Sequence, residues 1–264
     1  RLTEELSIPV MHDDQHGTAI ISSAALLNAL DITEKKIEDV KMVVCGAGAA
    51  AISCTRMYKD FGLNPKNIIM TDSKGVIRSD RDDLSVEKKE FATSINVNTL
   101  EEAMNGSDVF IGLSKANMVT PKMLLSMAKD PIVFAMANPD PEIDYLLAMK
   151  TRDDIIMATG RSDHPNQVNN VLGFPFIFRG ALDVKATKIN DEMKRAAVKA
   201  LASLAKESVP EFVNIAYDKT KLTFGRNYII PKPFDPRLIT KIPPEVGKAA
   251  INSEPPLSPD TETA

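Results

Sequence analysis

The chain has 264 residues, of which 44% are hydrophobic, and its 32 basic and 36 acidic side chains leave a formal net charge of −4. A chain of this size can bury a substantial core, so it is expected to fold rather than to stay disordered. The near balance of charges gives no reason to expect a nucleic-acid partner. No apolar run approaches the ~18 residues of a transmembrane helix, so no membrane association is expected.

Short apolar runs alternate with helical patterns along the first part of the chain. Residues 8–11 are expected to form a short strand, and residues 19–30 a buried helix. Further strands are expected at 40–45, 67–71, 107–112, 131–137 and 154–158, with helices near 49–61, 99–105, 120–129 and 141–149. This alternation predicts an α/β fold, a doubly wound parallel sheet of Rossmann type with helices on both faces.

The rest of the chain has mostly helical patterns. They extend from 168 to about 205 and include an amphipathic helix over 189–205. The proline-rich segment 231–236 is expected to be a rigid extended connection, followed by a short helix near 243–252. The end of the chain is rich in Pro, Ser, Thr and Glu and is expected to be a linker or a disordered tail.

The two cysteines are Cys45 and Cys54. They form no CxxC motif and have no His beside them, which argues against a zinc site. Free thiols fit a reducing compartment, so a cytoplasmic location is expected.

A glycine-rich turn follows the strand expected at 40–45 and precedes a helix. It fits the pattern G-x-G-x-x-A, in which the first glycine permits a tight turn and the second lets the backbone approach a pyrophosphate. The helix that follows offers free N–H groups to the phosphates. A tight turn without a ligand is the alternative. The residues expected to bind the cofactor here are Gly46, Ala47, Gly48, Ala49 and Ala50.

The choice between NAD and NADP is expected to depend on Asp72, Ser73 and Lys74, at the end of the next strand. An acidic residue at this position commonly binds the ribose 2′-hydroxyl and favours NAD. A hydroxyl and an ammonium group suit a 2′-phosphate and favour NADP. We expect NADP, with a solvated Lys74 as the alternative.

Two adjacent carboxylates, Asp13 and Asp14, lie between the first expected strand and the first expected helix. Adjacent acids repel each other, so a cation or a partner lysine would stabilise them. Mg²⁺ and Mn²⁺ prefer carboxylate oxygens. The alternative is that Asp14 caps the helix N-terminus, and spacing alone does not separate the two.

Side-chain amides follow two further strands of the expected sheet. Asn138 comes at the end of 131–137, and Asn169 and Asn170 come after 154–158. The carboxyl ends of strands in open α/β sheets are where ligands bind, and amides can bind carboxylate, hydroxyl or carboxamide groups. Loop and cap roles are the alternative for each amide taken alone.

Taken together, these segments resemble malic enzyme of the bacterial type that decarboxylates malate. The resemblance covers about residues 8–240, and its combination of segments is far more specific than any one of them. The segments that carry it are Ile8 to Thr18, the Gly46 turn, Asp72 to Ile77, Asn138-Pro139, Thr159 to Asn170, Phe174-Pro175 and Phe178 to Asp183.

The resemblance implies oxidation of L-malate with hydride transfer to NADP or NAD, followed by metal-assisted loss of CO₂ to give pyruvate. It implies that Asp14 is a ligand of Mg²⁺ or Mn²⁺ and that Asp13 helps to orient the catalytic lysine. It further implies that Asn138, Asn169 and Asn170 hold the nicotinamide ribose and malate, and that Ala47 to Ala50 line the pyrophosphate.

The family takes its catalytic Tyr and Lys, a malate-binding Arg and two further metal ligands from sequence that would precede Ile8. We therefore expect a separate N-terminal catalytic domain as a partner, little turnover by this chain alone, and a homo-oligomer. The expected division is 1–12 as the end of the catalytic domain, 13–169 as the cofactor domain, 170–250 as helices that pack back on the catalytic domain, and 251–264 as a linker or disordered tail.

Two other functions fit parts of the sequence. A metal-independent Rossmann dehydrogenase would keep the Gly46 turn but would not need the adjacent Asp13 and Asp14. A non-catalytic dinucleotide-binding or assembly domain would bind the cofactor but would not restore activity when the N-terminal half is supplied.

Overall fold

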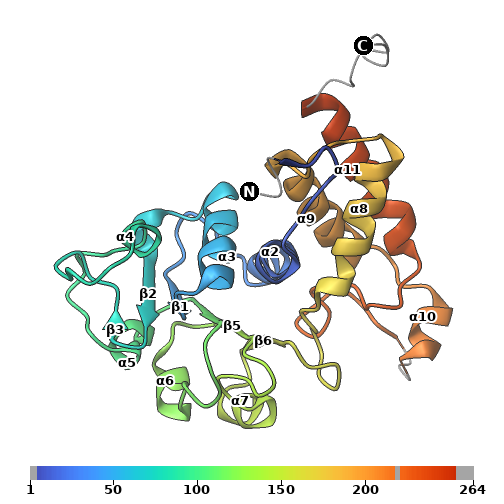
Figure 1. The fold of residues 1–264 in the computed structure, drawn as a ribbon. Coiled ribbons are helices and arrows are strands. Elements are labelled where there is room, and N and C mark those ends of the chain that lie inside the picture. Colours follow the sequence, from blue (N-terminus) through green and yellow to red (C-terminus); the bar gives the residue numbers. More distant parts are fainter. Residues whose placement is uncertain (1–4, 218–220, 254–264) are drawn as a thin grey trace.

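The computed structural model describes residues 5–217 and 221–253. A six-stranded sheet occupies one side of the molecule, with strand order β3-β2-β1-β4-β5-β6 (Figure 1). All neighbouring strands are parallel except β2 and β3, which are antiparallel. The strands are β1 (Met42–Cys45), β2 (Ile68–Asp72), β3 (Gly75–Val76), β4 (Val109–Gly112), β5 (Ile132–Ala135) and β6 (Ile156–Thr159).

Helices cover both faces of the sheet, because successive side chains of a strand point to opposite faces. In β1, Met42 and Val44 pack in the larger apolar cluster with α2 and α3, whereas Val43 and Cys45 pack in the smaller cluster with α5, α6 and α7. The doubly wound fold is therefore confirmed. The helices of this half are α2 (Asp13–Ile32), α3 (Ala49–Asp60), η1 (Pro65–Asn67), α4 (Val86–Lys89), α5 (Leu100–Met104), α6 (Pro121–Ser126) and α7 (Tyr145–Thr151).

A second group of helices lies on the other side of the molecule, and α2 lies between it and the sheet (Figure 1). Within this group α11 packs on both α8 and α9, while α9 packs on α2. The side chain of Asn28 in α2 donates hydrogen bonds to the carbonyl oxygens of Ala202 (2.9 Å) and Ile229 (2.8 Å), which ties the two sides together. The elements are η2 (Asn170–Leu172), α8 (Phe174–Asp183), α9 (Asp191–Lys206), α10 (Glu211–Ala216) and α11 (Arg237–Ser253).

Several elements differ from those expected, most clearly at the two ends of the chain. Residues 8–11 form no strand, and α2 begins at Asp13 rather than near residue 19, because carboxylates in a first turn suit the positive end of a helix. Helix α11 begins at Arg237 and contains Pro243 and Pro244, although proline commonly marks a helix start. It also includes residues 251–253, whereas the remainder of the expected tail lies outside the described residues.

Among the described residues, no helix combines the length and the apolar character needed to cross a bilayer.

Candidate dinucleotide-binding site

The order of the strands reverses between β1 and β4, so the crevice for a ligand is expected at the carboxyl ends of these two strands. Gly46 follows β1 directly, and Leu113 follows β4. The Leu113 N–H donates to the carbonyl oxygen of Cys45 (2.9 Å), and the Gly46 N–H donates to that of Thr71 (3.0 Å). The backbone of three neighbouring strands is thus fixed around the glycine turn.

The two glycines of the turn have different roles. Gly46 has a φ of +119°, and a Cβ there would lie 2.5 Å from the carbonyl oxygen of Leu113, so only glycine fits. Gly48 is the N-cap of α3, where no side chain satisfies the first N–H groups, and a Cβ there would meet no atom within 4 Å. Ala51, the third small residue of the pattern, is buried against the sheet. The open N-terminus of α3 can therefore accept phosphate groups.

Asp72, at the end of β2, is held by cations that the sequence did not single out. Its carboxylate accepts hydrogen bonds from Arg81 Nη1 (3.0 Å), Lys88 Nζ (2.7 Å) and the backbone N–H of Lys74 (2.9 Å). Burial by itself would raise the pKa of Asp72, but these donors outweigh it and lower the pKa to about 2. Arg81 and Lys88 lie in a polar segment without periodicity, so no pattern could pair them with Asp72.

The two residues that follow Asp72 are exposed. Ser73 has an accessible hydroxyl, and Lys74 forms an ion pair with Asp83 (2.7 Å). Asp83 also accepts a hydrogen bond from Arg81 Nε (2.9 Å). The end of β2 is therefore a charged network with several cations around one buried carboxylate.

Asp13 and Asn170 meet at the start of α2. Asn170 Nδ2 donates to Asp13 Oδ2 (3.1 Å), and the Thr18 hydroxyl donates to Asn170 Oδ1 (3.2 Å). A Cβ on Gly17 would collide with Asp13 Oδ1, so glycine makes room for the carboxylate. Asp13 Oδ1 itself is buried and has no hydrogen-bond partner among the described residues. A buried carboxylate oxygen without a donor suits a cationic group supplied from elsewhere.

The other expected site residues lie at separate places. Asp14 is exposed in the first turn of α2, and Asn138 is exposed three residues after the end of β5. Asn169 Oδ1 accepts from the Val171 N–H (3.0 Å) and so caps η2. Within residues 5–217 and 221–253, no group of three or more His, Cys, Asp or Glu side chains could hold a metal ion. Asp14 alone cannot form a complete metal site.

One amide of the segment 165–170 has a structural role. Asn166 is 2% exposed, and its Nδ2 donates to the carbonyl oxygens of Met157 (3.0 Å) and Arg226 (2.7 Å). Its Oδ1 accepts from the Ile229 N–H (3.0 Å). This side chain joins β6 to the segment before α11 and is not available to a ligand.

A buried carboxylate that the sequence did not single out lies at the ends of β4 and β5. Glu142 is 0% exposed, and its two oxygens accept from the backbone N–H groups of Ser114 (2.9 Å) and Ala137 (3.1 Å). Burial raises the pKa of Glu142 above its usual value.

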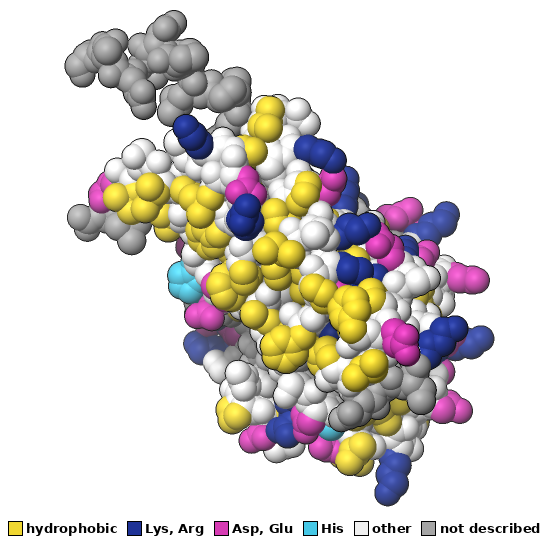
Figure 2. Space-filling view, turned by 90° about the vertical axis from the view of Figure 1, so that its right-hand side faces the viewer, with side chains coloured by type: hydrophobic (Ala, Val, Ile, Leu, Met, Phe, Trp, Pro, Cys, Tyr) yellow, Lys and Arg dark blue, Asp and Glu magenta, His cyan; other side chains and the backbone are white. Residues whose placement is uncertain are grey.

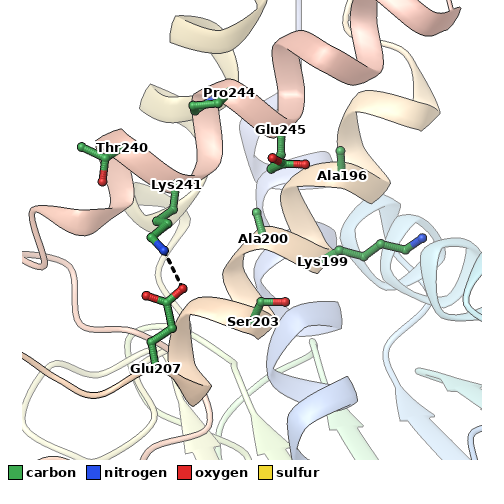
Figure 3. A pocket seen from close by; sticks show the side chains of 9 residues that line it. All are labelled: Ala196, Lys199, Ala200, Ser203, Glu207, Thr240, Lys241, Pro244 and Glu245. Carbon is green, nitrogen blue, oxygen red and sulfur yellow. Dashed lines mark hydrogen bonds and ion pairs between the residues drawn. The ribbon is translucent and has the colours of Figure 1, made fainter.

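A groove of about 440 Å³ lies between α9 and α11, on the helical side of the molecule (Figure 3). Its floor includes Ala200 and Ser203 of α9, and the ion pair between Lys241 Nζ and Glu207 Oε1 (2.7 Å) spans it. The groove offers no glycine turn to a phosphate, so we assign it no part in dinucleotide binding.

The fold and the glycine turn define a dinucleotide-binding domain of the doubly wound class. Residues 15–217 match the family described as the NAD-binding domain of malic enzyme, and the chain belongs to this family. Fold class and dinucleotide binding were thus correctly predicted from the sequence.

Individual relatives agree with this assignment. The chain is 55% identical over 252 residues to an NADP-dependent malic enzyme of Halomonas elongata, a match that covers 96% of this chain and 60% of the relative. It is 48% identical over 254 residues to an NAD-dependent malic enzyme of Rhizobium meliloti, covering 96% and 33%. The crystal structure of Entamoeba histolytica malic enzyme superimposes with a TM-score of 0.83 at 39% identity, covering 95% and 51%. The chain thus spans only part of these proteins.

Proposed function

We propose that this chain forms the NADP-binding part of an enzyme that oxidises L-malate and releases CO₂, leaving pyruvate and NADPH. The observation that carries the proposal is the Gly46–Gly48 turn, which leaves the N-terminus of α3 open at the switch point of the sheet. The names of the Halomonas elongata and Rhizobium meliloti relatives support the substrate and the reaction. Because the chain spans part of those relatives, it is expected to show little or no turnover alone.

NADP is favoured over NAD by the charges around Asp72. A ribose 2′-hydroxyl would need a free carboxylate oxygen on Asp72, and both oxygens already accept hydrogen bonds from Arg81 and Lys88. A 2′-phosphate would instead find these two cations with Ser73 and Lys74 beside them. The negative charge of the 2′-phosphate would compete with the carboxylates of Asp72 and Asp83 for the same cationic hydrogen-bond donors.

The residues at the start of α2 would act in the part of the site that binds malate. Asp13 would orient a catalytic lysine through its unpartnered Oδ1, with Asn170 holding the other carboxylate oxygen. Asn138 and Asn169 would hold the nicotinamide ribose and malate. Asp14 would be this chain's oxygen ligand for Mg²⁺ or Mn²⁺, which supplies positive charge beside the substrate oxygens.

A calorimetric titration of the chain with NADP⁺ and then with NAD⁺ tests the cofactor. We expect binding of both, with NADP⁺ at least about tenfold tighter, because one charge-assisted contact contributes roughly 1.5–3 kcal/mol. Tighter binding of NAD⁺ would contradict the role given to Arg81 and Lys88. Binding of neither by a chain that circular dichroism shows to be folded would overturn the proposed function.

An exposed apolar face on the helical side supports the proposal that this chain is one part of a larger enzyme. Figure 2 shows hydrophobic side chains gathered over the side of the molecule formed by α8, α10 and α11. Faces of this kind commonly mark protein–protein contacts. We infer that this face packs against the catalytic part that completes the relatives of this chain. The exposed large apolar side chains of these three helices are Phe174, Leu182, Phe212, Ile215, Ile239 and Ile251.

Association with a separately expressed catalytic part tests this face. The chain should co-purify with the N-terminal part of the Halomonas elongata relative, and the pair should oxidise malate only when Mg²⁺ or Mn²⁺ is present. Ile239→Asp should reduce this association at least about tenfold, because a charge would be buried among apolar side chains. Ile239 is 52% exposed in the chain alone, so its substitution should not unfold it.

Leu146→Asp on α7 is the matched control, since Leu146 is 67% exposed but lies on the sheet side. Equal loss of association in both variants would contradict the role of the apolar face. A chain that dimerises by itself through Ile239 would show that a second copy covers this face instead. Activity without a divalent ion would favour a metal-independent dehydrogenase.

A further inference from the structure

Glu142 is a buried acidic residue at the carboxyl ends of the strands, where the dinucleotide is proposed to bind. It lies between β5 and α7, four residues after Asn138, and is 0% exposed. A Cβ on Gly112, the last residue of β4, would collide with the Glu142 carboxylate. The sequence thus leaves a space on β4 that this carboxylate fills.

The two oxygens of Glu142 join two loops. Oε1 accepts from the Ser114 N–H (2.9 Å), one residue beyond the Leu113 carbonyl that lies against Gly46. Oε2 accepts from the Ala137 N–H (3.1 Å), one residue before Asn138. One side chain therefore fixes both the backbone behind the glycine turn and the backbone that presents Asn138.

Within the described residues, no lysine or arginine is paired with Glu142, whose carboxylate is held by backbone N–H groups instead. A buried carboxylate with two N–H donors and no cation costs free energy that an apolar side chain would not. A helix-capping or surface role is excluded by its burial. The carboxylate is thus placed where it can hold two loops in register, at a cost to the stability of the fold.

We propose that Glu142 is a positioning residue for the nicotinamide half of the dinucleotide, holding the loops after β4 and β5 against the Gly46 turn. The inference rests on the proposed function, since it needs a dinucleotide at the switch point. In a doubly wound sheet the adenosine half lies over one set of strands, here β1 and β2, and the other half lies over β4 to β6. Both N–H groups that the Glu142 carboxylate binds belong to the loops after β4 and β5.

Glu142→Gln tests the inference in the 264-residue chain. A glutamine oxygen can accept one of the two N–H groups, but its amide nitrogen would face the other donor and release that loop. We expect the affinity for NADP⁺ to fall about tenfold, and the affinity for adenosine 2′,5′-bisphosphate to stay within about twofold. This split between whole cofactor and adenosine half would not arise from a general loss of stability. Gly112→Ala should give the same split, because its Cβ would displace the carboxylate.

Asp154→Asn is the matched control. The Asp154 carboxylate also accepts a backbone hydrogen bond, from the Asp130 N–H to Oδ2 (2.8 Å). Asp154 precedes β6, so it lies at the amino ends of the parallel strands, opposite the proposed dinucleotide site. This variant should lower the melting temperature without changing either affinity. The inference is overturned if Glu142→Gln binds both ligands like the wild type, or loses both equally. If the wild type binds neither ligand, the proposed function itself fails.

Discussion

Replacing Gly46 by alanine should abolish dinucleotide binding and also destabilise the chain. The residue has a φ of +119°, and the new Cβ would lie 2.5 Å from the Leu113 carbonyl oxygen. Left-handed backbone costs an L-residue about 1–2 kcal/mol, and the contact with a fixed carbonyl adds to it. We expect the free energy of unfolding to fall by about 2 kcal/mol or more. Urea denaturation and calorimetric titration with NADP⁺ measure the two effects.

Gly48→Ala separates binding from stability in the same turn. A Cβ on Gly48 meets no atom within 4 Å, and its backbone is extended, so the free energy of unfolding should stay within about 0.5 kcal/mol of the wild type. Affinity for NADP⁺ should nevertheless fall at least about tenfold, because the methyl group occupies the approach to the phosphates. A Gly48→Ala chain that binds NADP⁺ normally would show that the phosphates lie elsewhere.

Asp72→Asn should cost about 2 kcal/mol of stability at neutral pH. The carboxylate is 7% exposed and holds Arg81 and Lys88, and its pKa is lowered from 3.8 to about 2. Because the folded-state pKa lies below the unfolded value, the contribution is fully present above about pH 4 and is lost as the pH falls towards 2. The difference in unfolding free energy between wild type and variant should therefore shrink over this interval. Urea denaturation at several pH values between 7 and 2 follows it.

Asp163→Asn is the control for that measurement. The pKa of Asp163 is also lowered to about 2 by a hydrogen bond from Arg161, but its side chain is 53% exposed, so solvent screens the pair. We expect almost no change in its unfolding free energy at any pH. If both variants lose the same stability, the burial of Asp72 among cations is not what stabilises this part of the chain.

The cations around Asp72 also bear on the proposed choice of cofactor. With the charge of Asp72 removed, Arg81 and Lys88 lose the group that holds them together. The sequence led us to expect NADP without excluding NAD, because an acidic residue, a serine and a lysine follow one another at the end of this strand. The proposed preference for NADP rests on the partners of the acidic residue, which lie nine and sixteen positions later in the chain.

Features encoded by local patterns were determined by the sequence itself. Apolar runs such as Met42–Cys45 make strands that are buried on both faces, and the alternation of such runs with helices dictates a doubly wound sheet. The turn at Gly46 follows from glycine at two positions between a strand and a helix. These features depend on periodicity and on backbone sterics within about ten residues. They can therefore be predicted without knowing the tertiary structure.

Only the tertiary structure shows which side chains far apart in the sequence come into contact. Asn170 reaches Asp13 across 157 residues, and Glu142 fills a space left by Gly112. The same holds for Asn166, whose amide looked like its neighbours in the sequence but is buried against Arg226. The contact of Glu142 with β4 forms because parallel strands bring their carboxyl ends together at one end of the sheet, whereas Asn170 meets Asp13 because η2 packs on α2. Local patterns therefore determined the fold and the phosphate turn, whereas the packing of strands and helices decided which polar side chains meet.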